Sequence, residues 1–224
     1  PSILCGCDLK ASAGQFIAVT GRSGSGKSTL LRLILGLESD YDGAIQINGR
    51  DLRHLSMPRV RQRIGSVLQE SQLLNATLYD NICCGRVIKG DEIESAIAQS
   101  GLGSWMDRFP MGLNTMLSDN GKNFSGGQRQ QILLARSLVG RPNLLLLDEA
   151  TSAMDDQTQK AVMDTLATLS MTRIIVAHRL STLRQADLIY VLDEGLIVQQ
   201  GTFQQLASRD GLFGSLVEAQ ARIE

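Results

Sequence analysis

The chain has 224 residues, enough for one large domain with a buried core, and 43% of them are hydrophobic, as in ordinary soluble proteins. Its formal net charge of −1 gives no long-range field that would attract nucleic acid. Its longest apolar run, Leu188–Leu192, is far shorter than the ~20 residues that cross a bilayer, and we expect no signal peptide.

Short apolar runs alternate with helical patterns in the first part of the chain. The elements predicted there are a strand at 16–19, a helix at 27–36, a hairpin at 44–52 and a strand at 64–69. The hairpin is predicted because Asn48-Gly49 is a favoured two-residue turn.

Strand-like runs are missing from residues 70–140, where helical patterns dominate at 91–101 and 125–138. The alternation then returns with a strand at 143–149, a helix at 155–170, a strand at 172–178, a hairpin at 187–201 that turns at Glu194-Gly195, and helices near 202–208 and 211–222. This order predicts an α/β fold in which a mostly parallel sheet is covered by helices and a helical segment is inserted.

Residues 21–28, GRSGSGKS, fit the phosphate-binding pattern G-x-x-x-x-G-K-[ST] in full, between a predicted strand and a predicted helix. The glycines let the loop wrap a phosphate with backbone N–H groups, Lys27 can reach the β- and γ-phosphates, and the Ser28 hydroxyl can ligate Mg²⁺. The residues predicted to hold ATP here are Gly21, Arg22, Ser23, Gly24, Ser25, Gly26, Lys27, Ser28 and Thr29.

Four polar residues end predicted strands, at the edge where ligands bind in open α/β sheets. Asp148 is expected to approach Mg²⁺ through water, and Glu149 is expected to polarise the attacking water as general base. Gln69, by itself typical of a solvated loop, can offer its amide oxygen to Mg²⁺. His178, by itself typical of a structural histidine, can donate a hydrogen bond to the γ-phosphate. The predicted metal ligands are thus Ser28, Gln69 and Asp148, and the predicted catalytic residues are Lys27, Glu149 and His178.

Ser125-Gly126-Gly127-Gln128 opens a second predicted helix. A serine at a helix start, followed by glycines that leave backbone N–H groups uncovered, favours anion binding. The sequence therefore predicts a second phosphate-binding helix start, 98 residues after Lys27 (125 − 27).

Together these segments resemble the ATP-binding-cassette (ABC) ATPases over essentially the whole chain. In order, the matching motifs are a Walker A at 21–28, a Q-loop at Gln69, a signature FSGGQ at 124–128, a Walker B with its glutamate at 144–149, a D-loop SAMD at 152–155 and a switch histidine in AHRLST at 177–182. The resemblance implies a P-loop NTPase (RecA-like) core with an antiparallel β subdomain at 1–69 and 141–224, and a helical subdomain at 70–140. A P-loop kinase of another family would not need SGGQ.

In this family the signature caps the γ-phosphate held by a second cassette in a head-to-tail dimer. The resemblance therefore implies that Ser125, Gly126, Gly127 and Gln128 contact a partner's ATP, and that Asp155 of the D-loop communicates across that interface. It also implies a transmembrane domain fused before the chain in the full protein. This chain is then expected at the cytoplasmic face of a bacterial inner membrane, with no nucleic acid as partner. The chain begins without Met and after the place of the family's adenine-stacking aromatic, so we expect an excised, soluble nucleotide-binding domain.

The stretch AHRLST resembles exporters, as does the position of Ser118-Asp119-Asn120-Gly121, where exporters carry the X-loop. Its Asp119, in place of the usual glutamate, favours bacterial peptide or bacteriocin exporters. Phe124 and Met154 replace the family's usual leucines. The alternatives are an importer ATPase and a soluble ABC ATPase acting on DNA or ribosomes, and the compact insertion and near-neutral charge disfavour the latter.

Two further clusters are given structural interpretations. The arginines in MPRVRQR at 57–63 are predicted to form a solvated face before a strand. The four cysteines lack zinc-ligand spacing, so they are predicted to be free thiols packed as small hydrophobes.

Overall fold

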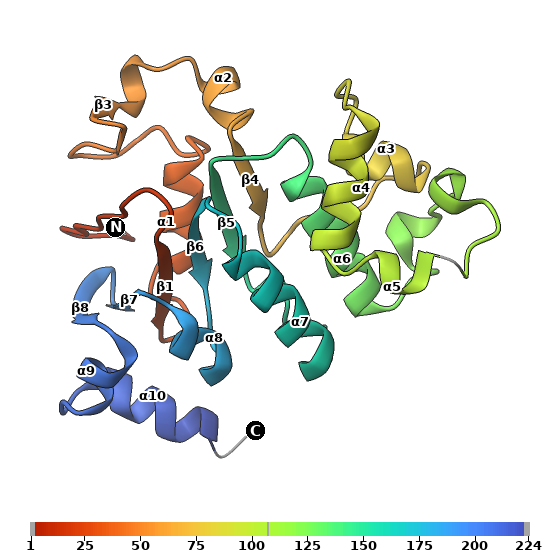
Figure 1. Cartoon of the computed structure of the whole chain (residues 1–224). Coiled ribbons are helices and arrows are strands. Elements are labelled where there is room, and N and C mark those ends of the chain that lie inside the picture. Colours follow the sequence, from red (N-terminus) through yellow and green to blue (C-terminus); the bar gives the residue numbers. More distant parts are fainter. Residues whose placement is uncertain (1–2, 107, 222–224) are drawn as a thin grey trace. The chain divides into compact units, whose positions relative to one another are not determined.

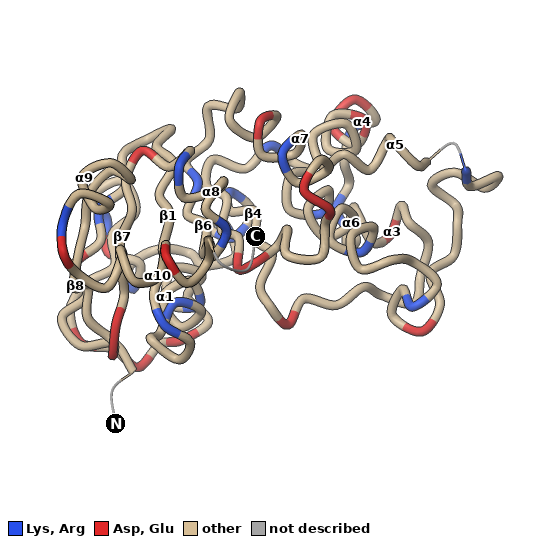
Figure 2. The backbone as a smooth tube through the Cα atoms, turned by 90° about the horizontal axis from the view of Figure 1, so that it is seen from below, with Lys and Arg blue, Asp and Glu red and all other residues tan. Residues whose placement is uncertain are grey.

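The structure is a computed structural model that describes residues 3–106 and 108–221. The chain forms two compact units (Figure 1). The first unit comprises Pro1–Arg61, Leu146–Asp148 and Met171–Glu224, and the second comprises Gln62–Leu145 and Glu149–Ser170. Basic and acidic residues are interspersed in both units (Figure 2). In the described part of the chain, no helix combines the length and the apolar character that a membrane span requires.

A sheet forms the centre of the first unit. Its strands are β1 (Phe16–Gly21), β6 (Thr172–Val176), β7 (Leu188–Asp193) and β8 (Leu196–Gly201), together with the end of β5 (Leu144–Asp148), in the order β5-β6-β1-β7-β8. β1 pairs in parallel with β6 and β7, whereas β8 runs antiparallel to β7. The whole of β1 is buried, as its unbroken apolar run predicts. Because Val19 is in register with both Val176 and Tyr190, the carboxyl ends of these three strands lie at one edge.

The first unit also contains helices, most of which contact this sheet. They are α1 (Lys27–Ile34), α2 (Met57–Arg61), α8 (Leu180–Gln185), α9 (Phe203–Ala207) and α10 (Leu212–Ala221), with a 3-10 turn η1 (Leu52–His54). α1, α8 and α10 pack against β1. Leu31 of α1 and Phe213 of α10 are fully buried, so the apolar face of each helix supplies the core. The predicted helix 211–222 is present as α10, and residue 222 lies outside the described residues.

Both predicted hairpins are confirmed. Asn48 (φ 51°) and Gly49 (φ 73°) join β2 (Gln46–Ile47) to β3 (Arg50–Asp51), and the two strands pair antiparallel. Glu194 (φ 45°) and Gly195 (φ 81°) join β7 to β8 in the same left-handed conformation. Two successive residues with positive φ match the right-handed twist of the flanking strands, which is why these dipeptides mark two-residue turns.

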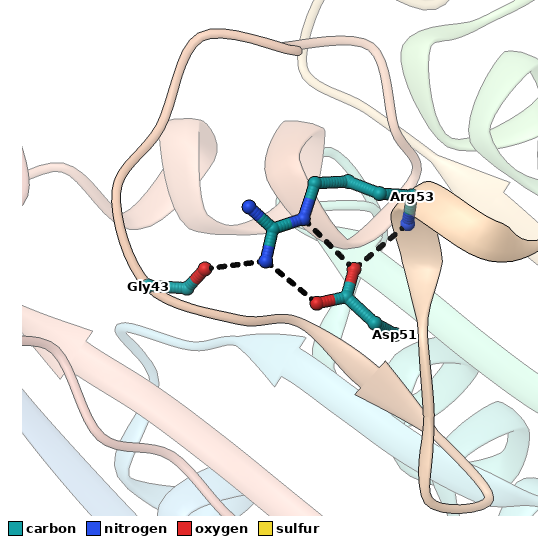
Figure 3. Close-up of polar contacts among 3 residues, drawn as sticks. All are labelled: Gly43, Asp51 and Arg53. Carbon is teal, nitrogen blue, oxygen red and sulfur yellow. Dashed lines mark hydrogen bonds and ion pairs between the residues drawn. The ribbon is translucent and has the colours of Figure 1, made fainter.

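A network of polar contacts follows the first hairpin. The Arg53 guanidinium donates to both carboxylate oxygens of Asp51, at 3.0 and 2.7 Å, and to the Gly43 carbonyl at 2.9 Å (Figure 3). The same carboxylate accepts from the Arg53 backbone N–H and so caps η1. These hydrogen bonds from Arg53 lower the pKa of Asp51 to about 2.

The lowered pKa predicts an acid-dependent contribution to stability. An unfolded aspartate titrates near pH ~3.9, so the contribution is fully present above about pH 4 and is lost as the pH falls toward 2. We expect Arg53→Ala to melt slightly below the parent at neutral pH, because the pair is exposed, and the two melting temperatures to converge in acid. Arg50→Ala, which removes a neighbouring exposed arginine, is the control. Any difference between its melting temperature and that of the parent should not shrink as the pH falls. A gap between Arg53→Ala and the parent that stays constant down to about pH 2 would contradict the assignment.

The second unit is built mainly from helices. They are α3 (Leu78–Cys83), α4 (Gly90–Gln99), α5 (Gly103–Met106), α6 (Gly126–Leu138) and α7 (Asp156–Ala167), with 3-10 turns η2 (Gly112–Asn114) and η3 (Asp119–Gly121). α6 packs against α3, α4 and β4 (Ile64–Val67), and its Ile132 and Leu134 are fully buried. A Cβ on Gly65 of β4 would lie 2.0 Å from the Ser137 carbonyl oxygen, so only glycine allows this contact.

A buried asparagine fixes the segment that follows Gln69. Asn81 is fully buried, its Oδ1 accepts from Leu74 N at 2.8 Å, and its Nδ2 donates to the carbonyls of Leu74 and Thr77, each at 3.0 Å. Arg136 of α6 donates to Asn81 Oδ1 at 2.8 Å and to the Gln72 carbonyl at 2.9 Å. The backbone of residues 72–77 is therefore held by side chains of α3 and α6.

Three expectations need correction. Short helices α2, α3, α5 and α8 were not predicted. Of the four free cysteines only Cys83 is buried, while Cys5 and Cys84 are exposed, so packing as small hydrophobes is wrong for the exposed pair. Arg61 is more than part of a solvated face, because its guanidinium donates to the Leu35 and Gly36 carbonyls at the end of α1.

Candidate nucleotide-binding site

The predicted phosphate loop lies in the first unit, between β1 and α1. Gly21 (φ 145°), Gly24 (φ 77°) and Gly26 (φ 102°) all have conformations that favour glycine. A Cβ on Gly21 would lie 1.9 Å from the Leu192 carbonyl oxygen of β7, so a side chain there would displace backbone. Nothing lies within 4 Å of where a Cβ of Gly24 would be, which leaves open space beside the loop.

Lys27 is folded into this loop. Its side chain is buried, and its ammonium donates to the carbonyls of Gly21 at 2.9 Å and Arg22 at 2.7 Å, with the Ser25 hydroxyl at 3.4 Å. The loop carbonyls hold a positive charge at the start of α1.

The start of α1 fits a phosphate. The N-cap is Gly26, which has no side chain to accept a hydrogen bond from the first turn, and that turn contains no acidic residue. Its N–H groups and the positive end of the helix dipole are therefore presented to an anion. Ser28 and Thr29 are half-buried in this turn, and a hydroxyl beside a phosphate is a usual Mg²⁺ ligand.

Two further predicted residues belong to the first unit. Asp148 is the last residue of β5 and is 4% exposed, and β5 neighbours β6 in the sheet. His178 follows the end of β6 and is exposed. The Ala177 N–H continues the ladder by donating to the Val19 carbonyl at 3.0 Å. The sheet thus brings His178 to the edge at which β1 enters the phosphate loop.

Gln69 and Glu149 belong to the second unit. Gln69 is exposed just after β4, next to a tight turn in which the Leu68 N–H donates to the Ser71 hydroxyl. Glu149 follows β5 and has φ 52°, a left-handed conformation that costs on the order of 1–3 kcal/mol in a residue other than glycine. Such strain often accompanies functional residues, and nothing in the sequence pattern of Glu149 predicts it.

The predicted signature begins α6. Ser125 is its N-cap, where the Ser125 hydroxyl accepts from Gln128 N at 3.2 Å and the Gln128 side-chain oxygen accepts from Ser125 N at 2.9 Å. This reciprocal pair is a capping box. The Ser125 hydroxyl still has a proton to donate, so capping leaves it able to bind a phosphate oxygen.

Gly126 and Gly127 allow the loop before α7 to lie against the start of α6. A Cβ on Gly126 would lie 3.1 Å from the Cβ of Ala153, and one on Gly127 would lie 3.1 Å from the Ala153 carbonyl oxygen. Asp155 caps α7 by accepting from Thr158 N at 2.9 Å, and hydrogen bonds from the side chain and then the backbone of Thr158 lower the pKa of Asp155. The predicted D-loop therefore ends at Asp155, which is the N-cap of α7.

Phe124, at the start of the signature, packs in an aromatic cluster. Its ring centroid lies 5.7 Å from that of Trp105 and 5.3 Å from that of Phe109. The Trp105 indole N–H donates to Gln131 of α6 at 2.6 Å. An aromatic residue in place of the usual leucine is thus accommodated by aromatic neighbours.

Sequence reasoning missed Gln130 of α6. It lies one turn after Gly126 on the same helix face, and its side chain contacts the loop that begins with Glu149. The signal in the sequence that could have found Gln130 was its position four residues after Gly126, which places both on one face of the helix.

The chain matches the family described as ABC transporter over residues 4–152. The chain belongs to the ABC transporter family. The predicted resemblance to this family and the predicted α/β fold with a mostly parallel sheet are thereby confirmed.

Similar ABC transporter proteins span most of this chain. It is 41% identical over 221 residues to ATP-binding cassette sub-family B member 5 of Mus musculus, covering 97% of this chain and 18% of that protein. It is 37% identical over 222 residues to an ATM1-type heavy metal exporter of Novosphingobium aromaticivorans, covering 98% of this chain and 36% of that protein. A solved structure of a bacterial Atm1-family ABC exporter with ATP bound matches with a TM-score of 0.93 and 37% identity, covering 98% of this chain and 39% of that one.

This ABC transporter chain therefore spans well under half the length of the relatives named here. Two of these three relatives are named as exporters. None of these three names a peptide exporter, so the bacterial peptide or bacteriocin group stays a prediction.

Proposed function

We propose that this chain is the ATP-hydrolysing motor domain of an ABC exporter. The observation that carries the proposal is the loop at 21–26, which holds the buried Lys27 ammonium at the uncapped start of α1. A buried cation at a helix N-terminus binds the phosphates of a nucleotide. The relatives named above, which include exporters, support ATP as the ligand and export as the outcome.

Each proposed site residue has one task. Lys27 binds the β- and γ-phosphates, and Glu149 accepts a proton from the water that attacks the γ-phosphorus, while ADP leaves with the bridging oxygen. His178 donates a hydrogen bond to the γ-phosphate. Bound Mg²⁺ would neutralise charge on the β- and γ-phosphates, and Ser28, Gln69 and Asp148 would hold it through a hydroxyl, an amide and a carboxylate oxygen, which suit this ion.

The signature residues act on a second cassette. Ser125 has a hydroxyl proton to donate, and Gly126 and Gly127 leave the first turn of α6 without side chains. In the proposed head-to-tail dimer this helix start meets the γ-phosphate bound by the partner chain, and the partner's signature meets the ATP bound here. ATP is then part of the dimer interface, and its hydrolysis releases the two chains.

The wider assembly follows from the same family. We infer a transmembrane domain in the full-length protein, with this domain at the cytoplasmic face of the membrane. We also infer that residues 1–69 and 141–224 work as the ATP-binding core and 70–140 as the helical subdomain of a single ABC ATPase domain.

Release of phosphate from ATP tests the proposal. The chain should hydrolyse ATP with Mg²⁺ present and lose that activity when EDTA removes the ion, because the charge on the phosphates is then no longer neutralised. Adding excess Mg²⁺ back should restore the rate, which controls for damage by EDTA. A chain that hydrolyses no ATP, or hydrolyses it equally well in EDTA, would contradict the proposal.

A further inference from the structure

Gln130 makes three hydrogen bonds to the loop that begins with Glu149. Its Nε2 donates to the Glu149 carbonyl at 3.3 Å and to the Ser152 hydroxyl at 3.0 Å. Its Oε1 accepts from the Ala153 N–H at 2.8 Å. One side chain of α6 therefore holds the loop at both ends.

The loop is also held by its own turn and by close packing. The Ser152 N–H donates to the Glu149 carbonyl at 3.1 Å, so this carbonyl accepts from both Ser152 and Gln130. Ala153 lies against Gly126 and Gly127, which are one helical turn before Gln130 and share its face. A Cβ at either glycine would lie 3.1 Å from an atom of Ala153, a tight contact, so both positions favour glycine.

These contacts surround a residue, Glu149, whose backbone conformation is unfavourable. Its φ of 52° is unfavourable for a residue with a side chain and persists only where the surroundings impose it. Holding the Glu149 carbonyl restrains the peptide plane that follows the Glu149 Cα, and the Glu149 side chain leaves the backbone from that Cα. The Gln130 side chain binds this carbonyl from outside the loop.

We propose that Gln130 is a positioning residue that holds Glu149 in the orientation required of a general base. The inference rests on the proposed function, in which Glu149 accepts a proton from the attacking water. A displacement of about 1 Å in a reacting group can cost about 10²-fold in rate. Gln130 contacts no phosphate in this scheme and acts only through Glu149.

Gln130→Ala is the first test. Turnover of ATP should fall by about 10- to 100-fold while the KM for ATP stays within about twofold, because the phosphate-binding loop is untouched. Gln130→Glu keeps an oxygen for the Ala153 N–H but loses the N–H donor to Glu149, so its turnover should fall as well. Gln99→Ala is the matched control, since this glutamine lies on α4 and its amide donates to Ser95.

A double-mutant cycle separates positioning of the base from a general structural role. In a Glu149→Gln chain the base is already lost, so adding Gln130→Ala should lower the residual single-turnover rate no further. Hydrogen exchange gives a readout without activity. The Ala153 amide should exchange faster in Gln130→Ala and stay protected in Gln130→Glu.

Each outcome decides the inference. An inactive parent chain would overturn the proposed function and this inference with it. An active parent with an equally active Gln130→Ala would overturn the inference alone, as would an equal loss in the Glu149→Gln background. If Gln130→Ala melts far below the parent, Gln130→Glu decides in its place: full turnover in that variant overturns the inference, and reduced turnover at unchanged KM supports it.

Discussion

Glu149→Gln should lower the rate of ATP hydrolysis by about 10²–10⁴ while ATP binding persists, because a general base contributes a factor of this size. Glutamine keeps the length and hydrogen-bonding capacity of the side chain but cannot accept a proton at neutral pH. The variant should therefore accumulate with ATP bound. Phosphate release and binding of a fluorescent ATP analogue measure the two effects separately.

Glu94→Gln is the control for this prediction. Glu94 is an exposed glutamate on α4, so the same change there should leave both hydrolysis and binding as in the parent. If Glu149→Gln hydrolysed ATP at the parent rate, the proton acceptor would have to be another group.

Ser125→Arg should block ATP-driven dimerisation and leave ATP binding to the dilute monomer nearly intact. In the proposed dimer Ser125 approaches the partner's γ-phosphate, and a long side chain would prevent that approach. The change also removes the N-cap of α6, which costs on the order of 1 kcal/mol of stability. Ser125→Thr retains both a cap and a hydroxyl on a compact side chain, so it separates the effect of bulk from that of capping. Sedimentation velocity with and without ATP measures dimerisation. Loss of ATP binding by the Ser125→Arg monomer would mean that the signature contacts the ATP of its own chain, and would contradict the prediction.

Mixing two inactive variants extends this prediction. A Ser125→Arg chain has an unaltered phosphate loop, and a Lys27→Ala chain has an unaltered signature. A dimer of the two contains one site with both changes and one site with neither. Some hydrolysis should therefore return on mixing, although each variant alone is inactive.

The hairpins and strands could be predicted because their signals are local. Asn48-Gly49 and Glu194-Gly195 adopt the positive φ angles that a two-residue turn requires. The apolar run at 16–19 lies within a strand whose residues are all buried. Helices α2, α3, α5 and α8 were missed because they span only 4 to 6 residues, too few to show a 3.6-residue period.

Motifs predicted the site residues, but they did not predict the contacts that support those residues. The Ser125-x-x-Gln128 spacing fits a capping box as well as an anion site, and in the structure both side chains cap α6. The contacts of Gln130 join residues 19 to 23 positions apart in the sequence, so they depend on the fold. The left-handed conformation of Glu149 could not be predicted either, because a glutamate usually avoids it.

The rate of ATP hydrolysis per chain, measured as the chain concentration is varied, tests the central claim most directly. If each ATP is hydrolysed between the phosphate loop of one chain and the signature of another, dilution should separate the chains and lower the rate per chain. The account therefore predicts a rate per chain that rises with concentration and then levels off. Hydrolysis at a constant rate per chain over the whole range would show that one chain is sufficient, and would contradict the proposed dimer.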